Sequence, residues 1–180
     1  AVMTQTALRL VVVGYGRMGR AVVAAARARG HQIAAIVSPH APEAAYLAVS
    51  ALTPRAGDVA VEFTHGEAAE HVVHDLLERG IPTVSGSTGW SDGVERMRSL
   101  AAQREVGFLW APNFSLGVAV AAELSSRAAV AFGALGGWSP YVIEEHHQAK
   151  RDAPSGTARL LADRVVRAMP GKTRYGVAPT

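Results

Sequence analysis

Apolar residues in the first two thirds of the chain alternate between short continuous runs and stretches with helical spacing. Five runs predict strands, at 8–13, 31–37, 58–63, 82–85 and 106–111. Three amphipathic stretches predict helices, at 17–29, 67–79 and 91–104. A regular succession of strand and helix is typical of a parallel sheet with helices on both faces, so we expect a doubly wound α/β fold.

The pattern changes after residue 112. Three elements are expected beyond it: a helix over 115–132, a strand over 141–145, and a helix from 154 or 155 to about 169. A polar segment rich in ionisable groups separates the last two. We therefore expect two domains, residues 1–112 and 113–180.

Composition narrows the classes of function. With 49% hydrophobic and 18% charged residues, the 180-residue chain can bury a core. Its net charge of +3 is too small to indicate nucleic-acid binding but suits a small anionic ligand. The absence of cysteine excludes disulfides, a thiolate nucleophile and a cysteine-built metal site. We find no apolar run long enough for a bilayer and no signal peptide in residues 1–10, and expect a cytoplasmic protein without membrane contact.

Residues 14–19 match the dinucleotide-binding pattern G-x-G-x-x-G, between a predicted strand and a predicted helix. In that context Gly14 permits a tight turn, Gly16 admits the pyrophosphate and Gly19 allows close packing of helix and strand. The helix N-terminus offers free N–H groups to phosphates. The alternative is a glycine-rich turn without a ligand.

The second predicted strand ends without the acidic residue that usually binds the ribose 2′-hydroxyl. The segment there is Ile36-Val37-Ser38-Pro39-His40. Without a carboxylate, a 2′-phosphate is not repelled, and Arg17 and Ser38 could bind it with help from His40. We therefore expect NADPH as the preferred cofactor, with NADH as the alternative. Arg17 could equally be an ordinary solvated helix residue.

Two further segments follow predicted strands. Phe63-Thr64-His65 and Gly86-Ser87-Thr88-Gly89 should lie on the carboxyl edge of the sheet, where ligands bind in open α/β folds. Each alone reads as an ordinary turn. Together with the glycine-rich turn, they outline one cleft.

The densest chemistry lies in residues 145–157, which read E-H-H-Q-A-K-R-D-A-P-S-G-T. Histidine exchanges protons near neutrality, and Lys150 can hold an anion. Ser155, Gly156 and Thr157 place hydroxyl and N–H groups at a predicted helix N-terminus. The alternative is a solvated loop with a helix cap. We expect no metal site, because the adjacent His146 and His147 lack a third ligand at metal spacing.

This segment resembles the signature E-H-H-x-x-K-x-D-x-P-S-G-T of the 4-hydroxy-tetrahydrodipicolinate (dihydrodipicolinate) reductase family. Four other segments are similar to family motifs in the same order: G-Y-G-R-M-G-R at 14–20, E-F-T-H at 62–65 (family D-F-T-H), G-S-T-G at 86–89 (family G-T-T-G) and A-P-N-F-S at 111–115. The resemblance covers nearly the whole chain.

The resemblance implies an NAD(P)H-dependent oxidoreductase of lysine and diaminopimelate biosynthesis, with a Rossmann domain and a mixed-sheet α+β domain for substrate and assembly. The assembly is usually a homotetramer, and the substrate is a small dicarboxylate. By resemblance, His146 donates a proton, Lys150 supports the transition state, and four residues bind substrate carboxylates: His147, Ser155, Gly156 and Thr157. The motifs together give the expected cofactor contacts: Gly14, Gly16, Arg17, Met18, Gly19, Ser38, Phe63, Thr64, Gly86, Thr88, Ala111, Asn113 and Phe114.

The sequence departs from the family pattern at a few positions. Glu62 stands for the usual Asp, Gly66 for Pro and Ser87 for Thr. The family's second domain normally continues beyond the length of this chain, so we expect that domain to be incomplete. Two alternatives to the reductase therefore stay open: a non-catalytic NAD(P)-binding module, and a reductase of another cyclic imine dicarboxylate.

Overall fold

The computed structural model describes residues 6–53, 58–146 and 154–177. The chain divides into two compact units, residues 1–112 and 113–180. Each unit is described by itself.

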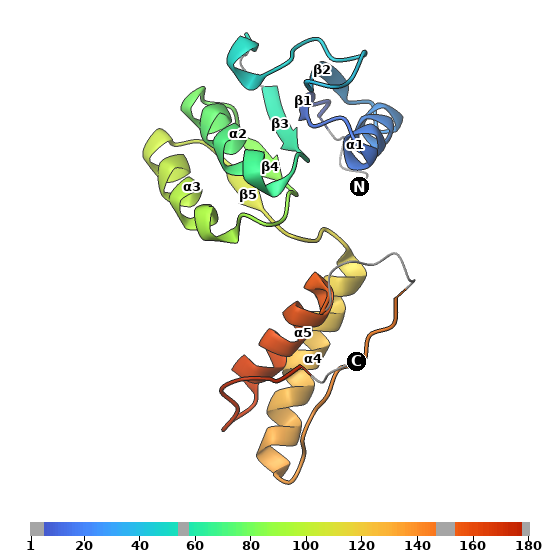
Figure 1. The fold of residues 1–180 in the computed structure, drawn as a ribbon, viewed down its shortest axis with the longest axis vertical. Helices are drawn as coiled ribbons and strands as arrows, with labels where there is room; N and C mark the ends of the chain where they lie inside the picture. Colours follow the sequence, from blue (N-terminus) through green and yellow to red (C-terminus); the bar gives the residue numbers. More distant parts are fainter. Residues whose placement is uncertain (1–5, 54–57, 147–153, 178–180) are drawn as a thin grey trace. The chain divides into compact units, whose positions relative to one another are not determined.

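The first unit is built on a five-stranded parallel sheet in the order β2-β1-β3-β4-β5 (Figure 1). The strands are β1 (Arg9–Val13), β2 (Gln32–Val37), β3 (Asp58–Glu62), β4 (Thr83–Ser85) and β5 (Phe108–Trp110). The register aligns all five last residues in one row: Val37, Val13, Glu62, Ser85 and Trp110. The loops that leave this carboxyl edge therefore start side by side.

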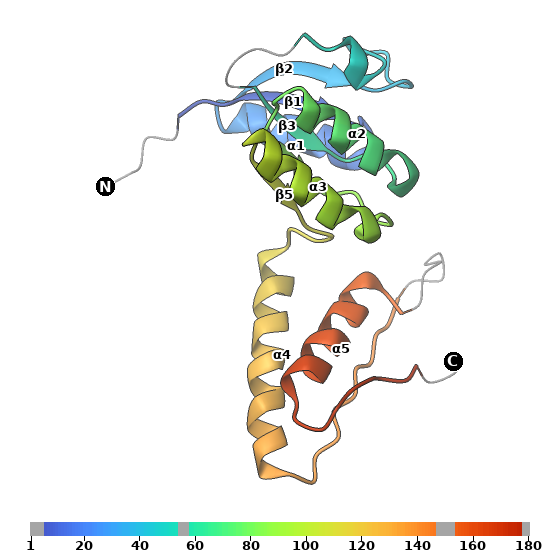
Figure 2. The ribbon, with the colours of Figure 1, turned by 90° about the vertical axis from the view of Figure 1, so that its left-hand side faces the viewer.

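Helices cover both faces of the sheet, as predicted (Figure 2). Helix α1 (Arg17–Ala28) packs through Val23 against Val12 and Ile36. Helix α2 (Gly66–Glu78) packs through Leu76 on the other face, which carries Val11 and its neighbours. Helix α3 (Ser91–Arg104) packs beside α2 and against β5. Because both faces are covered, the central strands are apolar at successive positions rather than at alternate ones.

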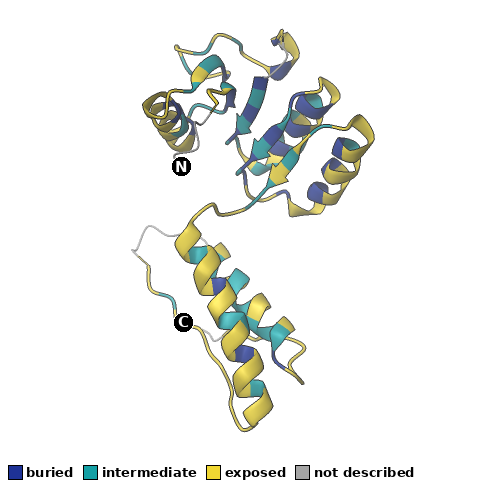
Figure 3. Ribbon diagram, turned by 180° about the vertical axis from the view of Figure 1, so that it is seen from behind, coloured by how far each residue is buried: buried dark blue, intermediate teal, exposed yellow. Residues whose placement is uncertain are grey.

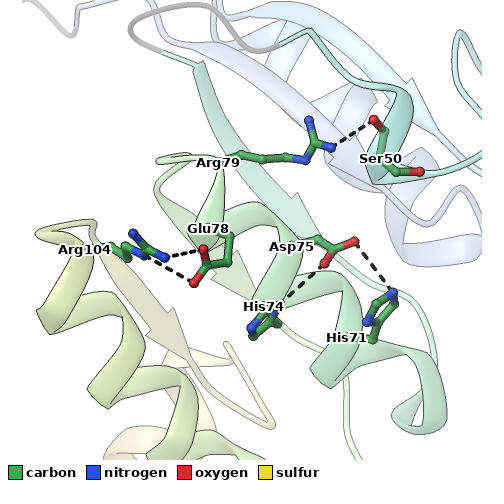
Figure 4. A network of polar contacts seen from close by, with 7 residues as sticks. All are labelled: Ser50, His71, His74, Asp75, Glu78, Arg79 and Arg104. Carbon is green, nitrogen blue, oxygen red and sulfur yellow. Dashed lines mark hydrogen bonds and ion pairs between the residues drawn. The ribbon is translucent and has the colours of Figure 1, made fainter.

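Polar contacts fasten α2 to the elements on either side of it (Figure 4). Arg104 of α3 forms an ion pair with Glu78. Arg79 donates to the carbonyl oxygen of Ser50, 2.9 Å away, in the short 3-10 helix η1 (Val49–Ala51). Within α2 itself, Asp75 lies 3.6 Å from both His71 and His74. Exposed pairs of this kind contribute little individually, so the apolar core carries most of the stability.

In the described part of the second unit, two helices pack against each other: α4 (Leu116–Leu135) and α5 (Gly156–Ala168). Their buried residues are small, namely Ala122 and Ala129 of α4 and Ala158 of α5. Alanine lets helix backbones approach closely. Most of α4 stays exposed (Figure 3).

The strand predicted at 141–145 is not formed. Residues 141–146 have no regular structure, and their large apolar side chains, including Tyr141 and Ile143, are exposed. An apolar segment becomes a strand only when another strand satisfies its backbone groups, and no such partner lies within 113–146 or 154–177. The preceding helix runs further than predicted, to Leu135, where Gly136 takes a positive φ of 70°.

Helix α4 also corrects the prediction that no segment could cross a bilayer. By length and composition alone, Leu116–Leu135 is long and apolar enough to do so. Near its middle, however, Glu123 and Arg127 form an ion pair of 2.9 Å. Charged side chains at the centre of a bilayer are costly, which disfavours a membrane-spanning role for this helix.

Candidate functional site

The glycine-rich turn after β1 is packed so closely that two positions require glycine. Gly14 has a φ of +87°, its N–H donates to the Val37 carbonyl at 2.9 Å, and a Cβ there would lie 2.3 Å from the Phe63 carbonyl oxygen. A Cβ on Gly19 would lie 2.0 Å from the Gly14 carbonyl oxygen. Both distances are far below van der Waals contact. The turn therefore lies directly against the β3 loop, where the strand order reverses and ligands bind in such sheets.

Gly16 differs from these two, because a Cβ there would meet no atom within 4 Å. It is the N-cap of α1, so no side chain caps the helix, and the first turn holds no acidic residue. The first backbone N–H groups of a helix have no partner within the helix and attract anions. Arg17 and Met18 are exposed in this first turn. These features fit the pyrophosphate of a dinucleotide.

The end of β2 presents a buried hydroxyl. Ser38 donates its N–H to the Tyr46 carbonyl at 3.0 Å, and its Oγ accepts from the His40 N–H at 3.3 Å. The acidic residue in the following loop, Glu43, pairs with Arg20 of α1 at 3.4 Å. This ion pair offsets the negative charge that Glu43 would otherwise place beside α1.

A buried carboxylate organises the loops after β3 and β4. The side chain of Glu62 is fully buried and accepts four hydrogen bonds. They come from the Thr64 N–H at 2.6 Å, the Thr64 hydroxyl at 2.5 Å, the Ser85 hydroxyl at 2.5 Å and the Ser87 hydroxyl at 2.6 Å. We call these four residues the Glu62 network. A buried carboxylate is stable only when it is well bonded, and this network meets that requirement from three directions.

Two tryptophans also bind the backbone of the loop after β4. The Ser87 carbonyl oxygen accepts from the indole N–H groups of Trp90 at 3.0 Å and Trp110 at 2.9 Å. The two rings pack edge to face with centroids 6.1 Å apart. Within the loop, a Cβ on Gly86 would lie 2.1 Å from the Phe63 ring. The backbone at 86–89 is therefore positioned from both sides.

In the second unit, one carboxylate contacts both the extended segment and α5. Glu144 Oε2 lies 2.7 Å from His146 Nε2, and Glu144 Oε1 accepts from the Ser155 N–H at 2.8 Å. Hydrogen bonds from Ser155 and then His146 lower the pKa of Glu144 to about 2. Glu144 is therefore an anion at neutral pH, next to the histidine expected to donate a proton.

Ser155 acts as the N-cap of α5. Its hydroxyl accepts from the Ala158 N–H at 3.1 Å, and the residue is buried. Gly156 is exposed and Thr157 half-buried in the first turn. An anion approaching this helix would thus meet Gly156 and Thr157 more directly than Ser155.

The structure places the predicted site residues in two groups. Along the carboxyl edge of the sheet lie Gly14, Gly16, Arg17, Met18, Gly19, Ser38, Phe63, Thr64, Gly86, Thr88 and Ala111. In the second unit lie Asn113 and Phe114, just before α4, and His146, Ser155, Gly156 and Thr157 around the start of α5. His147 and Lys150 lie outside the described residues.

Sequence reasoning assigned no role to Glu62, Trp90, Trp110 or Glu144. A signal existed for two of them. Glu62 is a carboxylate at the end of an otherwise apolar buried strand, a position that requires a partner. Glu144 precedes His146 by two residues, a spacing that places both side chains on the same side of an extended segment.

Two family models match the chain in order. "Dihydrodipicolinate reductase, N-terminus" matches residues 8–114, and "Dihydrodipicolinate reductase, C-terminus" matches residues 117–178. A 4-hydroxy-tetrahydrodipicolinate reductase of Stenotrophomonas maltophilia (strain K279a) is 43% identical over 169 residues, which cover 88% of this chain and 69% of that protein. The reductase of Xanthomonas campestris pv. campestris (strain B100) is 38% identical over 170 residues, covering 89% and 70%.

Solved structures show the same fold. The dipicolinate-bound dihydrodipicolinate reductase from Paenisporosarcina sp. TG-14 superimposes with a TM-score of 0.68 at 21% identity, covering 97% of this chain and 71% of that one. A scyllo-inositol dehydrogenase from Lactobacillus casei, with bound NAD(H), superimposes with a TM-score of 0.53 at 15% identity, covering 69% and 42%. The structural likeness agrees with the sequence matches across both units, and the chain belongs to the dihydrodipicolinate reductase family.

Proposed function

We propose that this chain reduces dihydrodipicolinate, formed from 4-hydroxy-tetrahydrodipicolinate, to tetrahydrodipicolinate with NAD(P)H, in lysine and diaminopimelate biosynthesis. The observation that carries the proposal is the match of both family models, in order, to residues 8–114 and 117–178. It is supported by a first unit suited to a dinucleotide and a second unit that carries the proton-donor candidate.

The first unit holds the nicotinamide cofactor in this proposal. The pyrophosphate binds at the N-terminus of α1. Gly14 and Gly16 lie in the turn before this helix, and Gly19 lies in its first turn. The backbone of Phe63, Thr64 and the 86–89 loop, positioned by the Glu62 network, lines the site next to the reacting ring. Met18 and Ala111 are further expected contacts in this unit, and Asn113 and Phe114, expected from the family motif, follow it in the chain. The bound cofactor supplies a hydride.

The cofactor we propose is NADPH in preference to NADH. Ser38 ends β2 where a carboxylate would select NADH, and the nearby Glu43 is paired with Arg20. Arg17 is exposed in the first turn of α1, and we assign it to the 2′-phosphate.

The second unit binds the substrate and delivers the proton. Hydride addition to the conjugated imine of the substrate builds up electrons on the neighbouring carbon, which then takes a proton. We assign that proton to His146, with Lys150 stabilising the charge that develops. His147, Ser155, Gly156 and Thr157 are assigned to the substrate carboxylates, helped by the α5 N-terminus.

We further propose that the protein is cytoplasmic and acts as a homotetramer. Support for self-assembly comes from α4, where Leu116, Leu124 and Leu135 are 83%, 60% and 75% exposed. A group of exposed apolar side chains on one element marks an interaction site in many proteins.

The test is NADPH and NADH oxidation with enzymatically generated substrate, using the wild-type chain and His146→Gln. We expect the substitution to lower kcat by about 100-fold or more, as for loss of a general acid, with nucleotide affinity unchanged. Wild-type turnover that survives in His146→Gln would remove His146 from the proton-donor role. Tight NADPH binding without any wild-type turnover would favour the non-catalytic module, and turnover of other cyclic imines alone would favour a different reductase.

A further inference from the structure

We propose that Glu144 is a positioning residue that selects which nitrogen of His146 delivers the proton. The inference rests on the proposed function, because it deepens the role of His146. None of the family segments named above includes position 144.

The geometry divides the Glu144 carboxylate between two partners. Oε2 lies 2.7 Å from Nε2 of His146, and Oε1 accepts the Ser155 N–H at 2.8 Å. Ser155 is buried and caps α5, so it is a fixed point for the carboxylate. Glu144 thus ties residues 141–146 to the start of a helix eleven residues later. Through Glu144, the orientation of the His146 imidazole is set by the start of that helix.

The polarity of this contact determines the state of the ring. An ionised carboxylate can only accept hydrogen bonds, and Glu144, whose pKa is lowered to about 2 by bonds from Ser155 and His146, is ionised at neutral pH. The imidazole must therefore donate from Nε2. Its transferable proton is then the one on Nδ1, which a protonated ring carries and a neutral ring of this tautomer lacks. In many catalytic and metal sites a carboxylate fixes the tautomer of a histidine, and we assign the same role to Glu144.

The neighbouring carboxylate provides a matched control. Glu145 adjoins Glu144 in the chain and is exposed. Glu145→Gln makes the same chemical change one residue away. We expect it to leave kcat and the ring state of His146 at their wild-type values.

Glu144→Gln keeps an oxygen for the Ser155 N–H but presents an amide donor to His146. We expect kcat to fall by about 10- to 100-fold, as when a residue that orients a functional group is lost, with KM for both substrates changed by less than about threefold. Glu144→Asp keeps the charge but shortens the side chain. It should retain more kcat than Glu144→Gln, although it disturbs the packing at least as much. A Gln variant as active as wild type, or more active than the Asp variant, would overturn the proposal.

A second readout does not depend on turnover. Two-dimensional ¹⁵N spectra of the histidine rings, with the His146 signals assigned by their loss in His146→Gln, report which nitrogen is protonated. We expect protonated Nε2 in the neutral ring of the wild type and of Glu145→Gln, and a shift toward protonated Nδ1 in Glu144→Gln. The same tautomer in all three proteins would overturn the proposal. If the wild-type chain lacks turnover, the proposed function fails, whereas this spectrum still tests the Glu144–His146 contact.

Discussion

Gly16 and Gly19 lie three residues apart in one turn, yet an added methyl group would clash at one position and fit at the other. At Gly19 it would collide with the Gly14 carbonyl at 2.0 Å, so backbone must move. At Gly16 it would meet open space, at a φ of −78° that any residue adopts.

We therefore predict that Gly19→Ala destabilises the chain by about 1–3 kcal/mol, whereas Gly16→Ala changes stability by less than about 0.5 kcal/mol. Gly16→Ala should instead weaken NADPH binding, because the methyl occupies the approach to the helix N-terminus. Thermal denaturation and nucleotide titration measure the two effects. Equal losses of stability in both variants would contradict the geometry of this turn.

Arg17 carries the proposed preference for NADPH. We predict that Arg17→Ala raises KM for NADPH by about tenfold or more, the usual effect of losing a charge-assisted hydrogen bond, and leaves KM for NADH within about twofold. Arg27→Ala, at the exposed last turn of the same helix, is the control. If Arg17→Ala affects both cofactors alike, Arg17 contacts a part that they share.

At the scale of single residues, the sequence predicted positions whose chemistry is local. The glycines after β1 are required by contacts within one strand–turn–helix unit, so a short motif identifies them. The bonds from Ser85 and Ser87 to Glu62, and from Trp110 to the Ser87 carbonyl, were not predicted, because they join β3, β4 and β5 and link residues more than 20 positions apart. Such contacts depend on the strand order, which no local pattern specifies.

Among the elements, the start of α5 should respond to acid. Bonding by Ser155 and His146 lowers the pKa of Glu144 from 4.5 to about 2 in the folded chain. A carboxyl whose pKa is lower in the folded state than in the unfolded state stabilises the fold when the pH is above the unfolded pKa. This contribution is lost as the pH falls through the folded pKa. The window is therefore pH 4.5 to about 2. Because the group is solvent-accessible, the effect is modest and sensitive to salt.

We predict that the difference in melting temperature between the wild type and Glu144→Gln is constant above pH 5 and shrinks between pH 4.5 and 2. The ¹³C shift of the Glu144 carboxyl should titrate with a midpoint near 2 in the native protein. A midpoint near 4.5 would show that the contacts with Ser155 and His146 do not persist in solution.

The order and type of the strands and α-helices in the first unit were predicted, with ends displaced by at most two residues. The short 3-10 helix η1 was not predicted. Strand β5, for example, spans 108–110 within the predicted run 106–111, because only those residues pair with β4. In the second unit both helices were predicted, but the strand at 141–145 was not confirmed. Its apolar residues satisfied the pattern for a strand, whereas a strand also requires a neighbour that the pattern does not describe.

For the whole molecule, the exposed side of α4 bears on self-assembly. Leu124 and Leu135 are both exposed and lie eleven residues apart, about three helical turns, so they share one side of the helix. We predict that the wild-type chain has a solution mass of about four chains, as proposed above, and that Leu124→Gln/Leu135→Gln lowers it. Light scattering coupled to size-exclusion chromatography measures both. A wild-type mass of one chain would contradict the proposed assembly.

The Glu62 network also has an evolutionary consequence. Relative to the motifs that the sequence resembles, Glu62 is one methylene longer than the usual Asp, and Ser87 is one methyl smaller than the usual Thr. These two departures meet in a single hydrogen bond of 2.6 Å inside the protein. We predict that the two changes compensate each other, because a longer acid needs the room that a smaller partner leaves. Glu62→Asp alone should therefore cost more stability than Glu62→Asp combined with Ser87→Thr, and a lineage could exchange one pair for the other only through a less stable intermediate.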